Sequence, residues 1–463
     1  MKNRSNSPDF NRRTFLKAAA GFGGAMLLGG VPFRAFAQAA NLAPADRCFV
    51  FAYFQGGWDQ LLALDPRDPT VFTIDRLSET RIQPGYDLIA DSSYPTMPVT
   101  PPTRSGAAPS NISFGPAIGR LADHYDLMAV IRGINMTTLA HDEGYRYFLT
   151  GKHPVGGAAR GSSVATEIVG QMKPVVPIPS VAYGVESYND RYPGSANALR
   201  VSRSTDLLLT LSPSTTALDS ELEKQLVDFR GQPISCEQAT YDSRGLTSAY
   251  RGSRDQMQAV LSQKLDTAFR FEQPQNDAVR ATYGLPATGP YETSAGRAAL
   301  VATALKRGIS QCVSITLTGS LDTHFGSQKN HADNLRLGFN ALGDLVTDLR
   351  ASPHPAGGSF MDHTTLMVFS EFARTPTINA TNGRDHHLCS SVLLMGAGLK
   401  HNVVFGKSGD VGMSPGLIDY KTGLPDPNGR NIFPEEVIAT VLASAGLDYS
   451  ITRTDPLRAL LAS

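Results

Sequence analysis

The sequence of 463 residues has few cysteines, a single tryptophan, little charge and no long hydrophobic run in its body. Charged residues make up 18% of the chain against 41% apolar ones, which excludes a disordered chain and a coiled coil. None of the four cysteines lies in a Cys-x-x-Cys pair, so we expect buried free thiols, although export would permit one disulfide. After the N-terminal segment no apolar run reaches about 18 residues, and we expect no integral membrane segment in the mature protein.

The body of the chain also lacks an excess of basic residues. The whole chain is neutral, with 42 basic and 42 acidic residues, but residues 1–37 hold six of the bases and one acid. The remainder therefore carries 36 basic and 41 acidic side chains. A mildly acidic body has no general attraction for nucleic acid or anionic lipid, and we expect no nucleic-acid partner.

The N-terminus carries an export signal. Arg12 and Arg13, within Asn-Arg-Arg-Thr-Phe-Leu-Lys, resemble the twin-arginine motif, and a short Gly/Ala-rich apolar run leads to a small-x-small cleavage site at residues 35–37. We expect residues 1–37 to be removed, with Gln38 first in the mature protein, the twin-arginine translocase as export partner, and a periplasmic or extracellular location. An uncleaved membrane anchor is the alternative, which the shortness and glycine content of the run disfavour.

Short apolar runs alternate with helical periodicity in the mature chain, which predicts an α/β fold with a mostly parallel sheet. The expected strands are Cys48–Phe54, Leu127–Ile131, Ser310–Thr318, Thr365–Ser370 and Val392–Met395. The expected helices are Ala298–Leu305, Leu335–Leu349 and Pro434–Ala445.

The chain divides into three parts after the signal. Residues 38–160 and 294–463 are expected to form the two halves of the α/β core. Residues 161–293 mix strand-like pieces with amphipathic helices around Ser220–Phe229 and Asp255–Phe271, and we expect an inserted cap region there.

Polar clusters follow three of the predicted strands directly. Gly-Gly-Trp-Asp ends at Asp59, Asp-Thr-His spans Asp322 to His324, and Ser-Glu-Phe-Ala-Arg-Thr contains Glu371. Because parallel strands present their carboxyl ends at one edge of a sheet, we expect these side chains to lie close together. For single residues, structural roles remain open: Asp59 as a turn residue and Glu371 in a helix-start ion pair with Arg374.

Histidines gather in the C-terminal part of the chain. Seven of the ten fall between residues 324 and 401, and Asp385, His386 and His387 stand just before the last predicted strand. Carboxylates and imidazoles that converge from several strand ends can hold Zn, Mn, Mg or Ca, so the sequence predicts a divalent metal site. A solvated loop pair is the alternative for His386 and His387, and we expect His331, His354 and His363 at the surface.

Taken in order, these motifs resemble the exported bacterial family called domain of unknown function 1501, which is related to the alkaline phosphatase and sulfatase superfamily. The resemblance covers about residues 48–447. It implies an alkaline-phosphatase-like sheet with helices on both faces and an inserted α+β subdomain. It also implies that the metal ligands come from Asp59, Asp322, His324, Glu371, Asp385, His386 and His387.

The nucleophile position departs from the superfamily pattern. Leu149-Thr150-Gly151-Lys152 resembles a run that follows the sulfatase nucleophile by about nine residues, which places His141 where a Ser, Thr or Cys-derived residue is expected. Thr137 and Thr138 are the nearby hydroxyls. His141 is alternatively a metal ligand or a substrate contact.

Two functions follow from this resemblance. The first is an exported metal-dependent hydrolase that acts on phosphate or sulfate esters, with an anionic small molecule as substrate. The second is a non-catalytic, metal-stabilised binding or assembly protein outside the cytoplasm, since a fold does not settle a function.

Overall fold

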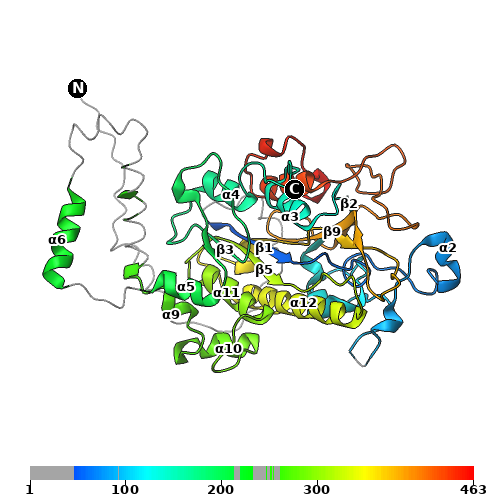
Figure 1. The fold of residues 1–463 in the computed structure, drawn as a ribbon, viewed down its shortest axis with the longest axis horizontal. Coiled ribbons are helices and arrows are strands. Elements are labelled where there is room, and N and C mark those ends of the chain that lie inside the picture. Colours follow the sequence, from blue (N-terminus) through cyan, green and yellow to red (C-terminus); the bar gives the residue numbers. More distant parts are fainter. Residues whose placement is uncertain are drawn as a thin grey trace. The chain divides into compact units, whose positions relative to one another are not determined.

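A computed structural model describes residues 46–91, 93–212, 219–232, 247, 251–252, 254 and 261–462 (Figure 1). The twin-arginine motif, the predicted cleavage site and Cys236 lie outside these residues, as do residues 255–260 of the expected helix Asp255–Phe271. Across the described part of the chain, no helix has both the length and the apolar character that crossing a membrane requires. Cys48, Cys312 and Cys389 are buried free thiols.

Eight strands form the central sheet, in the order β10-β2-β9-β6-β1-β5-β3-β4. Only β9 runs against its two neighbours, β2 and β6, and the other pairs are parallel, so the predicted α/β class with a mostly parallel sheet is confirmed. The strands are β1 (Cys48–Phe54), β2 (Met128–Asn135), β3 (Ser180–Tyr183), β4 (Leu199–Val201), β5 (Cys312–Thr318), β6 (Thr364–Phe369), β9 (Cys389–Gly396) and β10 (Val403–Phe405). A second, two-stranded sheet pairs β7 (Ala373–Arg374) with β8 (His386–His387).

The central strand β1 is buried over its whole length, because both faces of the sheet are covered. Alternate side chains of β1 enter two separate cores, as the two-residue period of a strand requires. Figure 1 shows α11 and α12 on one side of the sheet and α3 and α4 on the other. Val50 and Phe54 face the core shared with α11 and α12, whereas Phe49 and Phe51 face the core shared with α3, α4 and α14. The helix bounds are α3 (His141–Thr150), α4 (Val164–Met172), α11 (Ser294–Lys306), α12 (Gln328–Ala351) and α14 (Pro434–Ser444).

The region 161–293 contributes both strands and helices. Its strands β3 and β4 extend the central sheet beyond β5. Its further helices are α5 (Ser204–Leu211), α6 (Ser220–Gly231), α9 (Asp266–Phe269) and α10 (Asp277–Tyr283).

Two glycines allow the segments around the sheet edge to approach one another closely. Gly56, just after β1, has a φ of 117°, and a Cβ there would lie 2.5 Å from the backbone nitrogen of Asp322. Gly144, in the first turns of α3, would place a Cβ 2.1 Å from the carbonyl oxygen of Glu371. Backbone contacts of this kind leave no room for a side chain, and they bring α3 and the loops after β1, β5 and β6 to one place.

Candidate metal centre

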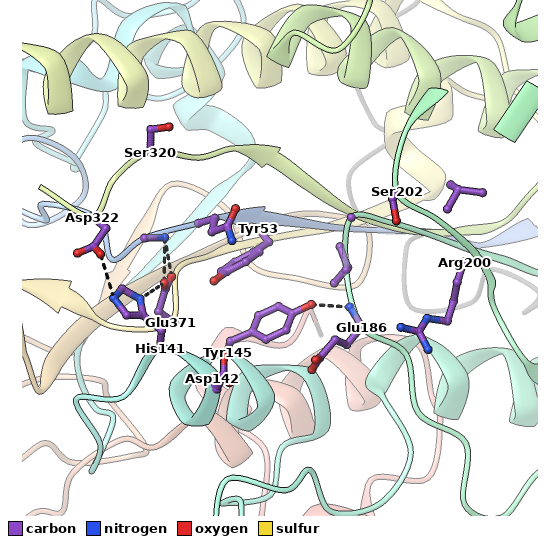
Figure 2. A pocket seen from close by; sticks show the side chains of 15 residues that line it. Tyr53, His141, Asp142, Tyr145, Glu186, Arg200, Ser202, Ser320, Asp322 and Glu371 are labelled. Atoms are coloured by element: carbon purple, nitrogen blue, oxygen red, sulfur yellow. Dashed lines mark hydrogen bonds and ion pairs between the residues drawn. The ribbon is translucent and has the colours of Figure 1, made fainter. Parts of the chain in front are cut away.

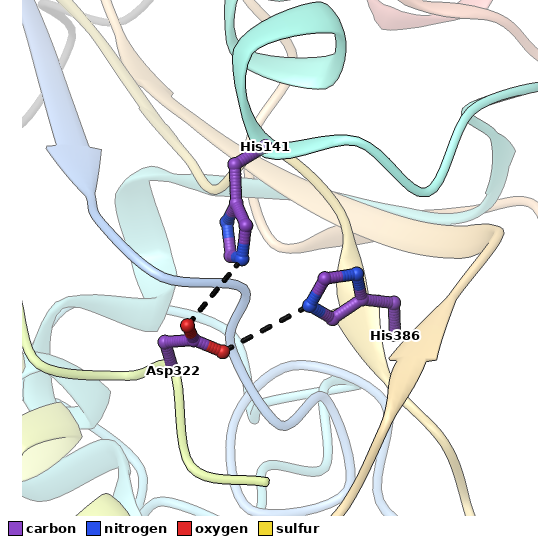
Figure 3. Close-up of side chains that lie close together, drawn as sticks. All are labelled: His141, Asp322 and His386. Carbon is purple, nitrogen blue, oxygen red and sulfur yellow. Dashed lines mark ion pairs between the residues drawn. The ribbon is translucent and has the colours of Figure 1, made fainter.

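Three side chains from distant parts of the sequence converge at this edge. His141 is the first residue of α3, Asp322 lies in the loop after β5, and His386 lies on β8 (Figure 3). One ligand atom from each of them lies within 4.8 Å of the others. Imidazole nitrogens and a carboxylate at this separation form a donor set suited to a divalent transition metal.

His324 extends the cluster. Its Nε2 lies 3.2 Å from Oδ1 of Asp322 and 2.9 Å from Nε2 of His386. Asp322 and His324 lie two residues apart in the loop after β5, and this loop brings both side chains to the same point.

A second layer of acceptors orients each imidazole ring through its Nδ1. Nδ1 of His141 lies 2.7 Å from Oε1 of Glu371, and Nδ1 of His324 lies 2.9 Å from Oδ1 of Asp385. Nδ1 of His386 lies 2.7 Å from the carbonyl oxygen of Leu139. Carbonyl and carboxylate oxygens accept hydrogen bonds, so each Nδ1 carries a proton, and in the neutral ring each Nε2 presents a lone pair.

These tautomers leave two lone pairs face to face, on Nε2 of His324 and Nε2 of His386. Such a contact is repulsive unless a proton or a metal cation accepts both pairs. The residues present therefore fit a divalent cation, held by the imidazoles and the Asp322 carboxylate.

Charge within the cluster is set by two neighbours. The hydrogen bond with Glu371 raises the pKa of His141 against the opposing effect of burial. Burial alone would raise the pKa of Asp322, but Arg374, whose Nη2 lies 2.7 Å from Oδ1, lowers it. Asp322 is therefore an anion at neutral pH and available as a ligand.

Arg374 also fixes the loops around the cluster. This fully buried side chain donates to the carbonyl oxygens of Gly56, Gly57 and Arg384 as well as to Asp322. The sequence left open an ion pair between Glu371 and Arg374. In the structure Arg374 pairs with Asp322 instead. Sequence reasoning identified its motif but missed this positioning role.

Glu371 and Asp385 support the cluster from the second layer. Glu371 is 1% exposed and accepts hydrogen bonds from the backbone N–H of Gly56 and the hydroxyl of Ser370, in addition to its contact with His141. Both carboxylate oxygens of Glu371 are therefore engaged in hydrogen bonds within the protein. The structure thus places both carboxylates behind imidazoles, where the sequence expected direct ligands.

Asp59 and His387 lie outside the cluster that the structure forms. Asp59 is 1% exposed, with Oδ2 2.8 Å from Nε of Arg384 and Oδ1 accepting from the backbone N–H of Leu61. The buried guanidinium of Arg384 thus neutralises the carboxylate that the sequence assigned to a metal. His387 follows His386 on β8, so its side chain points the other way, and its Nε2 lies 3.0 Å from the carbonyl oxygen of Gly412.

His331 is buried, contrary to the expected surface position, and so is His363. Nε2 of His331 accepts from the backbone N–H of Asp59 at 2.9 Å, while its Nδ1 contacts the hydroxyl of Thr323 at 2.8 Å. Burial lowers the pKa of His331 to about 3, so the ring is neutral. It therefore braces the loop after β1 against the loop that carries Asp322, a role with no local sequence signal.

The two candidate hydroxyl nucleophiles are engaged elsewhere. Oγ1 of Thr137 donates to the carbonyl oxygen of Met136 at 2.7 Å. Oγ1 of Thr138 donates to Oε2 of Glu143 at 2.7 Å and accepts from the backbone N–H of Ala140. Thr138 thus stabilises the start of α3, where His141 takes the position beside Asp322.

A pocket of about 770 Å³ opens beside the cluster. Figure 2 shows Asp322, His141 and Glu371 at one end, Tyr53 and Tyr145 along the middle, and Arg200 at the other end. A second pocket of about 780 Å³ shares four lining residues with the first, namely Gln55, Gly184, Ser202 and Ser320. The cluster therefore lies at one end of an extended groove on the carboxyl edge of the sheet.

Comparisons with known proteins give a family and distant structural likenesses. The model of a family described as "Protein of unknown function (DUF1501)" matches residues 46–450, and no curated protein matches the sequence. Among solved structures, Ps i-CgsB is 7% identical with a TM-score of 0.37, over 89% of this chain and 75% of that one. An alkaline phosphatase superfamily protein from Vibrio parahaemolyticus is 10% identical with a TM-score of 0.35, over 93% and 75%. A TAB5 alkaline phosphatase variant with Mg bound is 10% identical with a TM-score of 0.32, over 88% and 100%.

Proposed function

The chain belongs to the DUF1501 family, and we propose that it is an exported metal-dependent hydrolase that acts on phosphate or sulfate esters. The observation that carries this proposal is the convergence of imidazole Nε2 atoms on the Asp322 carboxylate, with every Nδ1 held by an acceptor. Asp322, His324, His386 and His141 would hold one cation. When bound, a divalent cation supplies Lewis-acid polarisation of an ester oxygen.

The side chains of the groove would hold and orient the ester. The reacting group would lie next to Asp322 and His141, and the remainder would extend past Tyr53 toward Arg200 (Figure 2). Glu371 keeps the proton of His141 on Nδ1, so that Nε2 always faces the reacting group. Arg374 holds the Asp322 carboxylate in place, so its orientation needs no rearrangement when substrate binds.

The alternative function, a non-catalytic metal-stabilised binding or assembly protein, is favoured by one observation. The hydroxyls of Thr137 and Thr138 both donate to other groups, and His141 stands where a hydroxyl nucleophile is expected. A protein of this kind would bind the metal and hydrolyse nothing.

Elemental analysis of the exported protein tests the metal, and ester hydrolysis separates the two functions. We expect about one divalent transition-metal ion per chain, because the described residues contain one cluster of this kind. Release of phosphate or sulfate from aryl esters, lost on chelation and restored by the metal, would support the hydrolase. Metal without hydrolysis across both ester classes would favour the binding protein, and absence of metal would contradict both.

Export is a separate part of the proposal and rests on the twin-arginine motif. Replacing Arg12 and Arg13 together with lysine should retain the protein in the cytoplasm. N-terminal sequencing of the exported wild type should begin at Gln38. Normal export of the double variant would contradict this route.

A further inference from the structure

A separate pocket of about 550 Å³ lies at the C-terminal end of α3, at the opposite end of that helix from His141. The loop after α3 lines one side with Lys152, His153 and Arg160, and the turn near the C-terminus lines the other with Arg453. This pocket shares no lining residue with the groove beside the candidate metal centre.

Its three permanent cations have no anionic partner. In the described part of the chain, neither Lys152 nor Arg160 nor Arg453 forms an ion pair. By contrast, Arg146 on the same helix pairs with Glu186, and Arg191 pairs with Glu167. Three cations that form no ion pair with a described residue line the same hollow, and their charge favours an anion there.

Two glycines of the loop lie close to Lys152. Gly151 ends α3 with a φ of 62°, which turns the chain sharply after the helix. Gly161, with a φ of 79°, would place a Cβ 2.5 Å from Nζ of Lys152. The lysine ammonium therefore lies directly beside the backbone of Gly161.

The two carboxylates that line the pocket accept hydrogen bonds from neutral hydroxyl groups. Glu435 accepts a hydrogen bond from the hydroxyl of Tyr147, and Asp190 accepts one from the hydroxyl of Ser162 at 2.6 Å. They reduce the positive charge of the pocket without pairing with its cations. The lining holds three permanent cations and two carboxylates, so a small excess of positive charge remains.

We propose that this pocket binds a tetrahedral oxyanion, a phosphate or sulfate group, between Lys152, Arg160 and Arg453. Guanidinium groups match the geometry of such anions and donate two parallel hydrogen bonds to them, while an ammonium group contributes a point charge. The site is distinct from the metal cluster, and its occupant is held by charge-assisted hydrogen bonds alone.

Isothermal titration calorimetry with sodium phosphate, sodium sulfate and glycerol 3-phosphate tests the proposal on the full mature chain. Besides any binding through the metal cluster, we expect one saturable site that weakens as ionic strength rises. The site should persist in Asp322→Asn, which removes binding through the metal cluster. Tighter binding of glycerol 3-phosphate would identify an organic ester as occupant, and equal affinities would identify the free anion.

Replacing Lys152, Arg160 and Arg453 together with glutamine should weaken binding by roughly tenfold or more, with each single variant losing roughly threefold to fivefold. Lys421→Gln, an exposed cation outside the pocket, is the matched control and should bind as the wild type does. The single variants keep the test decisive if the triple variant fails to fold. Absence of saturable binding in the wild type, or equal binding in the variants, would overturn the proposal.

Discussion

At the scale of the residue, neighbouring side chains of the same type have opposite surroundings. His386 faces the Asp322 carboxylate, whereas His387 faces the carbonyl oxygen of Gly412. The dipeptide His-His indicates a site in the sequence, but only the direction of β8 decides which ring can serve. Asp59 and Asp322 also have different surroundings, although a buried arginine pairs with each of them. Asp59 is buried, whereas about half of the Asp322 side chain is exposed beside the cluster.

Replacing His386 or His387 with glutamine, one at a time, tests which of the two histidines is a metal ligand. His386→Gln should weaken metal binding by roughly a hundredfold, because it removes a ligand and its Nδ1 support together. His387→Gln should leave the affinity within about threefold of the wild type, since its ring points away. Competition with a chromogenic chelator measures both, and equal losses in the two variants would remove His386 from the site.

Glu371→Gln tests the second layer. The amide can keep a contact with His141 but loses the negative charge that fixes the Nδ1 proton, so metal affinity should fall roughly tenfold to a hundredfold. Asp142→Asn changes an exposed carboxylate of the same pocket and should have little effect. An unchanged affinity in Glu371→Gln would mean that His141 needs no support from this carboxylate.

At the scale of the element, the pattern of apolar residues predicts strands and helices, but it does not predict contacts between segments that are far apart in the sequence. The apolar runs predict β1, β5, β6 and β9 because both sides of these strands are buried, and the leucine spacing predicts the central part of α12. The position of Asp322 and His324 at the carboxyl edge of the sheet can also be predicted, because both residues follow a predicted strand directly. The pairing of Asp59 with Arg384, and the burial of His331 between two loops, depend on contacts between segments far apart in sequence, which no local pattern encodes.

The close contact between α3 and the loop after β6 requires a glycine at position 144, which has no side chain. Gly144→Ala would set a Cβ 2.1 Å from the carbonyl oxygen of Glu371, so α3 must shift and take His141 with it. We expect a loss of roughly 1–3 kcal/mol in the free energy of unfolding together with weaker metal binding. Gly252→Ala, where the new Cβ meets nothing within 4 Å, is the control. Full metal affinity in Gly144→Ala would show that α3 does not position the site.

At the scale of the whole molecule, buried neutral imidazoles connect distant elements and make the fold sensitive to acid. His124 lies in the segment Pro116–Leu127, and its Nε2 contacts the carbonyl oxygen of Gly343 and the hydroxyl of Thr347 on α12. Burial, aided by Arg350 and Arg104, lowers the pKa of His124 to about 4. His331 joins two loops at the other end of the same helix, and burial lowers its pKa to about 3.

The sign of the resulting pH dependence follows from proton counting. Between the ordinary histidine pKa near 6.5 and the folded value of about 4, the unfolded chain binds a proton at residue 124 that the folded chain does not. The free energy of unfolding must therefore rise with pH through this window and fall on acidification, by up to about 3 kcal/mol for this one group.

Urea denaturation of the wild type and His124→Gln at pH 7, 5.5 and 4 measures the effect. The variant should be less stable at pH 7 but lose less stability toward pH 4, because glutamine has no proton to gain. Both proteins keep the same metal ligands, so acid release of the metal affects them equally and cancels in the difference. Parallel pH profiles would mean that His124 has the same pKa in the folded and the unfolded chain, so that burial does not keep this ring neutral.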